Sequence, residues 1–103
     1  MPKKAKSEIV CIAHFTAKRG KQGELLRSLH KLMEPTHKEK GCVRYELNQQ
    51  IDNPRKITFV EKWADMKIFK KHCAMPYITD YFKNVAPKLV ASQNIALHKE
   101  ILP

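Results

Sequence analysis

The spacing of apolar residues changes at Gly41, and this change constrains the fold more than any other feature of the sequence. Before Gly41, from Gln22 to about Lys38, apolar residues recur at the i, i+3, i+4, i+7 spacing of an amphipathic helix. After it, from about Cys42 to Gln50, apolar and polar residues alternate as in a strand with one buried face. Glycine readily adopts the left-handed conformation that ends many helices. The sequence therefore predicts a helix that ends near Gly41 and leads directly into a strand.

Four segments have the composition and alternation of β-strands. The second and third are separated by Asp52-Asn53-Pro54, a strong turn signal, so we expect these two strands to form a hairpin. On the second strand, Val43, Tyr45 and Leu47 are expected to share the face that is turned to the core. The four strands are predicted at residues 9–17, 42–50, 56–63 and 92–102.

Two helical regions separate these strands. Pro35 lies inside the first, and we expect it to kink that helix about one turn earlier. Asp65 can N-cap a second helix over residues 66–72. Pro76 can begin a further helical segment, which Pro87 is expected to interrupt.

The length of 103 residues indicates one domain, which we place at residues 9–103 after a basic N-terminal tail at residues 1–8. The element order, β-α-β-β-α-(α)-β, is that of a ferredoxin-like α+β fold, with a four-stranded antiparallel sheet and helices on one face. Such a sheet leaves its other face bare, and a chain of this size buries only a modest core. We therefore expect a homodimer in which the two sheets pack against each other.

The net charge is +10, from 20 Lys and Arg against 10 Asp and Glu, which raises the question of nucleic acid or a membrane surface as partner. The basic residues are scattered, however, and no helix-turn-helix or zinc-finger pattern accompanies them. We therefore expect a solvated basic surface and no nucleic-acid partner. No apolar run is long enough for a signal-peptide core or a membrane span.

The three cysteines, Cys11, Cys42 and Cys73, are odd in number and lack a CxxC pair. This argues against a disulfide framework and favours a reducing cytoplasm, with the thiols as small buried side chains. The five histidines are dispersed without an HxxxH pair, so no metal site is expected. With three glycines and no phosphate loop, no nucleotide cofactor is expected either.

Two ionisable residues are candidates for chemistry. Alternation places Glu61 on the same strand face as Phe59 and Trp63, where burial without a cation would raise its pKa and make it a usable general base. The alternative is that Glu61 forms a structural ion pair. His72 ends the second helix and can point under the helices, either to accept a proton from an acidic phenol or to form a structural hydrogen bond.

Three segments together match a family pattern. Residues 39–45 read Glu-Lys-Gly-Cys-Val-Arg-Tyr at a helix end, residues 61–63 read Glu-Lys-Trp, and His72 follows about two helical turns later. This pattern, Glu-x-Gly-Cys-x-x-Tyr, Glu-x-Trp and a later His, resembles the antibiotic biosynthesis monooxygenase family over nearly the whole chain. The resemblance implies a dimeric α+β barrel and a cofactor-free monooxygenase, in which an electron-rich dihydroquinone or polyphenol reacts with O2.

The resemblance also implies a dry pocket in which His72 and Glu61 manage the protons. His37 is expected to overhang its mouth. For Tyr45, packing in the core is the alternative role. The pocket-lining residues that the resemblance implies are Tyr45, Trp63, Phe69 and Tyr77.

Other functions occur on this fold. A related branch of the family isomerises a phosphorylated signal molecule, and a non-catalytic role in binding a small aromatic molecule is also open. Haem-degrading relatives use an Asn on the first strand, a Trp on the second helix and a haem-ligating His further on. The corresponding regions here hold Ala13 or His14, His72, and Tyr81 or Phe82, so haem degradation is disfavoured.

Overall fold

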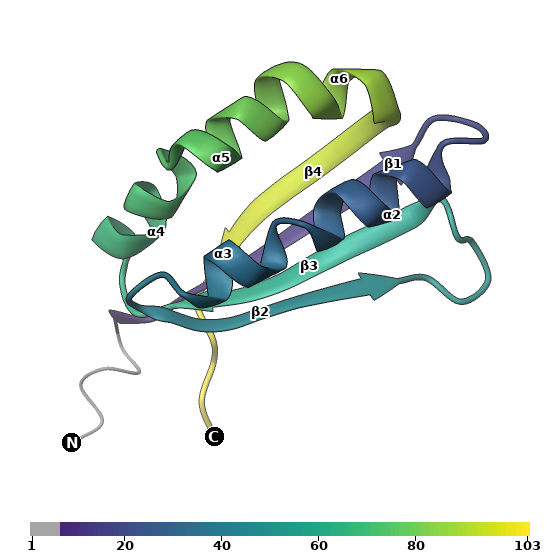
Figure 1. Ribbon diagram of the computed structural model, residues 1–103. Coiled ribbons are helices and arrows are strands. Elements are labelled where there is room, and N and C mark those ends of the chain that lie inside the picture. The colour runs from purple at the N-terminus through teal and green to yellow at the C-terminus, as the bar shows by residue number, and fades with distance from the viewer. Residues whose placement is uncertain (1–6) are drawn as a thin grey trace.

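The computed structural model describes residues 7–103 and contains a four-stranded antiparallel sheet with helices packed on one of its faces (Figure 1). The strands are β1 (Ile9–Ala17), β2 (Cys42–Gln49), β3 (Lys56–Trp63) and β4 (Val90–His98). They lie in the order β2-β3-β1-β4, so the first strand pairs with both the third and the fourth. This is the ferredoxin-like α+β fold that the element order predicted. Of the predicted basic tail, residues 1–6 lie outside the described residues.

The first helical region is divided into α2 (Gln22–His30) and α3 (Met33–His37). The division falls about one turn before Pro35, as predicted, because the proline ring collides with the carbonyl four residues earlier. After β3, the side chain of Asp65 caps α4 (Met66–Cys73) by accepting a hydrogen bond from a backbone N–H of its first turn at 2.8 Å.

The last helical region continues further than predicted, through α5 (Pro76–Asp80), the π-helical turn η1 (Tyr81–Val85) and α6 (Ala86–Leu89). The prediction that Pro87 interrupts this region is wrong. The wider π-helical turn precedes it, and Pro87 lies in the first turn of α6, where no backbone N–H is required. No helix within residues 7–103 is both long and apolar enough to cross a membrane.

One residue of β2 departs from its predicted face. Val43 was expected in the core, but it is 54% exposed. In the ladder between β2 and β3, Cys42 pairs with Trp63 and Arg44 pairs with Lys62. Val43 is therefore the extra residue of a β-bulge, and the predicted alternation holds only after it.

The last strand is shorter than predicted and ends at His98, which pairs with Val10 of β1. The predicted alternation beyond this point, at Ile101, is wrong, because no further pairing extends the strand. Ile95 and Leu97 are on the helix side of the sheet, opposite buried residues of β1, yet they are 43% and 44% exposed. The helices therefore leave the β4 edge of the sheet incompletely covered.

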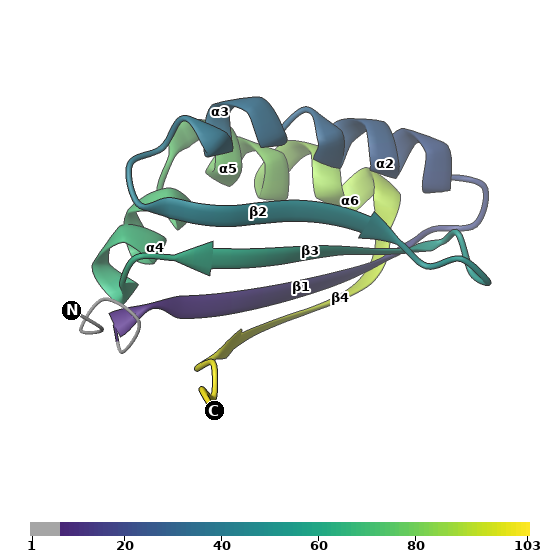
Figure 2. The ribbon, with the colours of Figure 1, turned by 90° about the horizontal axis from the view of Figure 1, so that it is seen from below.

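No helix of the described chain lies over the other face of the sheet (Figure 2). In register across its centre stand the half-buried Ile12 and Val60, with Ala96 beside them on β4. The next row in the ladder is polar and includes a hydrogen bond of 2.8 Å between His14 Nδ1 and Thr58 Oγ1. This face thus combines an apolar centre with polar neighbours.

We predict that two copies associate through this face. Burying Ile12 and Val60 of each copy removes from solvent the apolar surface that a single sheet leaves exposed. Sedimentation at micromolar concentration should give about twice the chain mass of 12.0 kDa. Ile12→Arg should produce a folded monomer. Ile51→Arg, in a fully exposed turn, should leave the dimer intact. A wild-type monomer under these conditions would contradict the prediction.

Candidate functional site

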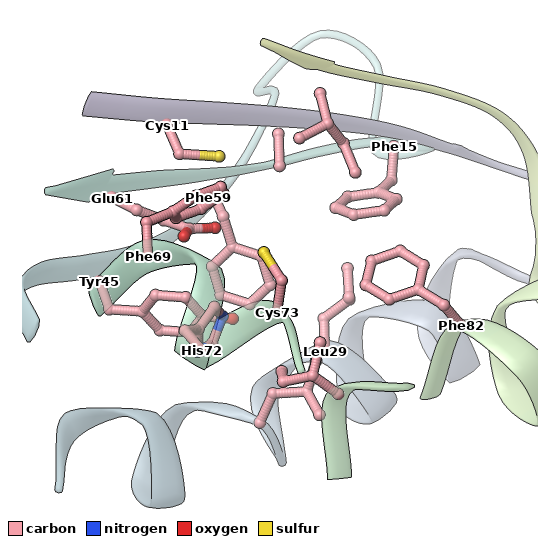
Figure 3. A pocket seen from close by; sticks show the side chains of 14 residues that line it. Cys11, Phe15, Leu29, Tyr45, Phe59, Glu61, Phe69, His72, Cys73 and Phe82 are labelled. Atoms are coloured by element: carbon pink, nitrogen blue, oxygen red, sulfur yellow. The ribbon is translucent and has the colours of Figure 1, made fainter. Parts of the chain in front are cut away.

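A cavity of about 60 Å³ lies between the sheet and the helices (Figure 3). Its polar groups are few: the Glu61 carboxyl, the His72 imidazole, the Tyr45 hydroxyl and the thiols of Cys11 and Cys73. The rest of the wall is apolar and comes from Ala13, Phe15, Leu29, Leu32, Phe59, Phe69, Ile78, Phe82 and Ile95.

Glu61 is buried in the wall of this cavity. The alternation of β3 turns its side chain toward the helices and leaves the residue 5% exposed. Its Oε1 accepts a hydrogen bond from Trp63 Nε1–H at 2.9 Å, and among residues 7–103 no Lys or Arg forms an ion pair with it. Burial raises the pKa of Glu61 to about 7, the Trp63 hydrogen bond opposes this shift, and the charge of Glu39 adds to it. The carboxyl can therefore hold or release a proton near neutral pH.

His72 lies near the end of α4 and points under the helices (Figure 3). Its ring centroid is 4.3 Å from that of Trp63 and 5.7 Å from that of Tyr45. Burial lowers the pKa of His72, although its contact with Glu39 opposes this shift. The imidazole is therefore neutral at pH 7, and one of its nitrogens is available to accept a proton.

A carboxylate to which the sequence analysis gave no role lies beside His72. Glu39, in the loop between α3 and β2, has its Oε2 at hydrogen-bond distance, 2.9 Å, from His72 Nδ1. The same oxygen, Oε2, accepts a hydrogen bond from the Tyr77 hydroxyl, which also lies 2.9 Å from Oγ1 of the buried Thr36. The signal that could have identified Glu39 is its place at the start of the Glu-x-Gly-Cys segment.

Of the residues expected at the pocket from the sequence, Tyr45, Glu61, Phe69 and His72 line the cavity. They come from β2, β3 and α4, and so from three separate parts of the chain. The Tyr45 ring stacks on Phe59 with 4.4 Å between centroids, which closes the wall on the β2 side.

The other expected residues do not line the cavity. Trp63 is 0% exposed and lies behind the lining, in contact with both Glu61 and His72. Tyr77 directs its hydroxyl to Glu39 instead. His37 donates Nε2–H to the Tyr45 backbone carbonyl at 2.9 Å, so it is attached to β2 and not placed at the cavity mouth.

The cysteines provide neither a strong nucleophile nor a metal site. Cys11 is buried, as expected. The same expectation is wrong for the other two cysteines, because Cys42 on β2 is only partly buried and Cys73 on α4 is exposed. Burial raises the pKa of Cys11 to about 12 and that of Cys42 to about 11, so both thiols stay protonated at neutral pH. Within residues 7–103, no three His, Cys, Asp or Glu side chains are placed to hold a metal ion together.

The sequence model of one protein family, antibiotic biosynthesis monooxygenase, matches residues 8–84. The chain belongs to this family. The family pattern and the geometry agree on one place, because the matched Glu39, Tyr45, Glu61, Trp63 and His72 all lie at or directly behind the same cavity.

Solved structures are similar to this family member throughout its length. Protein SO0527 from Shewanella oneidensis is 44% identical, with a TM-score of 0.88 over 90% of each chain. PA3566 from Pseudomonas aeruginosa is 24% identical, with a TM-score of 0.87 over 93% of this chain and 96% of that one. A structure named antibiotic biosynthesis monooxygenase is 23% identical, with a TM-score of 0.81 over 92% of this chain and 99% of that one.

A curated relative is the uncharacterized protein sll1783 from Synechocystis, which is 23% identical over 97 residues. The match covers 94% of this chain and 66% of that protein, so the chain spans about two thirds of its relative's length.

We predict that Glu61→Gln stabilises the protein most at and above pH 7. The pKa of Glu61 in the folded chain is about 7, above the ordinary value of 4.5, so the folded chain holds this proton more tightly than the unfolded chain does. The wild-type free energy of unfolding should therefore fall as pH rises from 4.5 to 7 and stay lower above that. Gln keeps an oxygen for the Trp63 N–H and cannot ionise.

Urea unfolding at pH 4.5, 6 and 8 measures this effect. The difference between Glu61→Gln and wild type should grow with pH by on the order of 3 kcal/mol. Glu34→Gln, an exposed change of the same kind on α3, should show no such trend. A difference that does not depend on pH would contradict the assigned pKa shift.

Proposed function

We propose that this family member is a cofactor-free monooxygenase that oxidises an electron-rich aromatic, such as a dihydroquinone or polyphenol, with O2. The observation that carries the proposal is the apolar cavity whose lining contains both a neutral His72 and a Glu61 of near-neutral pKa. Such groups exchange protons with a phenol, while apolar walls exclude water from reactive intermediates. The match of the sequence to the antibiotic biosynthesis monooxygenase family also supports the proposal.

The substrate supplies the electrons in this reaction. A base removes one hydroxyl proton, and the phenolate passes an electron to O2 to give a semiquinone and superoxide. These combine through a new C–O bond at a ring carbon, and the proton returns to give a hydroperoxide. The base then removes the hydrogen of that carbon, a C=O bond forms, the O–O bond breaks, and the departing hydroxide takes the proton. One dihydroquinone and one O2 thus become one hydroxyquinone and one water.

His72 is the proposed base for the first proton, because its imidazole is neutral at pH 7. The Trp63 ring, 4.3 Å away between centroids, stabilises the imidazolium that forms. Glu61, with a pKa of about 7, is proposed to accept and return a proton in the later steps. The protein's part is thus to move protons and exclude water, with no metal or flavin required.

The cavity of about 60 Å³ is smaller than the roughly 300 Å³ or more typical of pockets for drug-sized ligands. We propose that an aromatic ring enters from the side of β4, where Ile95 is 43% exposed and the helices leave the sheet edge incompletely covered. The half-buried Phe69 and Phe82 at the cavity can change rotamer to make room.

Oxygen uptake with a panel of hydroquinols tests this function. The metal-free protein should consume O2 faster than each substrate autoxidises. His72→Ala should lower kcat by roughly 10²-fold or more through loss of the general base, with the dimer mass unchanged. His30→Ala, on the exposed side of α2, is the matched control and should retain wild-type turnover.

If wild-type protein shows no rate above autoxidation with any hydroquinol, the monooxygenase proposal fails. Unchanged binding of aromatic ligands by wild type and His72→Ala would then favour a non-catalytic binding role.

A further inference from the structure

We propose that Glu39 is a positioning residue of this site: it holds His72 in the tautomer that carries its proton on Nδ1, and so leaves Nε2 free to accept the substrate proton. The inference rests on the proposed role of His72 as the base. It assigns to Glu39 a task that neither the sequence pattern nor the family match specifies.

The contact between the two side chains carries the argument. The distance from His72 Nδ1 to Glu39 Oε2 is 2.9 Å, and the two side chains are only 6% and 9% exposed. Glu39 Oε2 already accepts the Tyr77 hydroxyl, so the matching role for His72 Nδ1 is that of donor, with the proton on Nδ1. Within the described part of the chain, no protein group is hydrogen-bonded to Nε2. A carboxylate that orients a histidine base through its second nitrogen is a recurring arrangement in acid–base catalysis.

Glu39 is itself fixed in place. Its Oε2 accepts the Tyr77 hydroxyl, and that hydroxyl is within 2.9 Å of Thr36 Oγ1. Its backbone N–H donates to the Thr36 carbonyl at 3.0 Å, and its carbonyl accepts from Cys42 N–H at 3.2 Å. Side chain and backbone are thus both held, as a group that orients another must be.

Gly41 brings this loop close to α4, the helix that carries His72. It adopts a φ of +89°, and a Cβ at this position would lie 2.5 Å from Ile68 Cδ1. Only glycine permits this approach, because a larger residue would have to displace the loop or the helix. The short distance between Glu39 and His72 therefore depends on the glycine two residues later.

The other titratable groups around His72 do not compete for this role. Burial raises the pKa of Tyr45, Tyr77, Cys11 and Cys73, so they stay neutral near pH 7. Glu61 on β3 changes charge in this range, but its Oε1 is bonded to Trp63. Glu39 is thus the carboxylate in direct contact with the imidazole, and its charge favours the imidazolium after proton transfer.

Nitrogen NMR of the histidine rings tests the tautomer directly. In ¹⁵N-labelled wild-type protein at pH 8, His72 should show a protonated Nδ1 and a bare Nε2. In Glu39→Leu, which removes the acceptor, the proton should move to Nε2. In Glu39→Gln, which removes the charge, the pKa of His72 should fall. Repeating the titration with Glu61→Gln present in every protein removes the one other group that ionises nearby. A proton on Nε2 in wild type would overturn the inference without any variant.

Kinetics separates positioning from simple structural support. Glu39→Gln should lower kcat by about 10²-fold while KM changes by less than about threefold, and its acidic limb of kcat against pH should shift to lower pH. Glu34→Gln, an exposed carboxylate on α3, should leave the tautomer, the pH profile and the rate unchanged. A normal rate in Glu39→Gln together with an altered tautomer or pKa would overturn the positioning role. If wild type turns over no hydroquinol, the proposed function fails, and the NMR result still decides whether Glu39 sets the tautomer.

Discussion

The close approach of Gly41 to Ile68 is the constraint on which the site depends. A Cβ at residue 41 would lie 2.5 Å from the Ile68 side chain, so the chain can cross from the end of α3 into β2 this near to α4 only with glycine. This crossing places Glu39 on one side of the turn and the first residues of β2 on the other. Gly41 does not cap the helix as predicted, because α3 ends at His37 with Lys38 as its C-cap; it instead allows the loop before β2 to pass close to the helix that carries His72.

The pKa shifts of the two ionisable residues at the cavity follow from their burial away from water. No Lys or Arg among residues 7–103 forms an ion pair with Glu61, and burial raises its pKa, whereas His72 is kept neutral by burial although it touches a carboxylate. Trp63 connects these two environments, because its N–H bonds Glu61 while its ring face packs on the imidazole. A fully buried residue can thus influence the ionisation of both side chains from behind the cavity lining. This explains how a tryptophan can belong to the family pattern and still lie outside the cavity.

Most of the fold could be predicted from the sequence, because it is encoded in local periodicity. The bounds of β3, the cap at Asp65 and the burial of Glu61 follow from alternation and capping alone. The bulge at Val43 could not be predicted in this way, since it depends on pairing with a strand that comes later in the chain. The continuation through Pro87 depends on a π-helical turn, for which the sequence has no regular period. Glu39 was missed because its partners, His72 and Tyr77, are more than 30 positions away.

Successive side chains of a strand point to opposite faces of the sheet. The residues that line the cavity are therefore different from those on the outer face. Odd positions of β1, such as Cys11 and Ala13, line the cavity, while Ile12 between them lies on the face that no helix covers. A change at Ile12 can therefore alter association without entering the site, whereas a slip of one residue in register would exchange the two faces completely. The bulge at Val43 is tolerated because it occurs at the first residues of an edge strand, before Tyr45, whose ring must face the cavity. Placing the irregularity there keeps the register of every later residue of β2, and with it the separation of the cavity from the outer face.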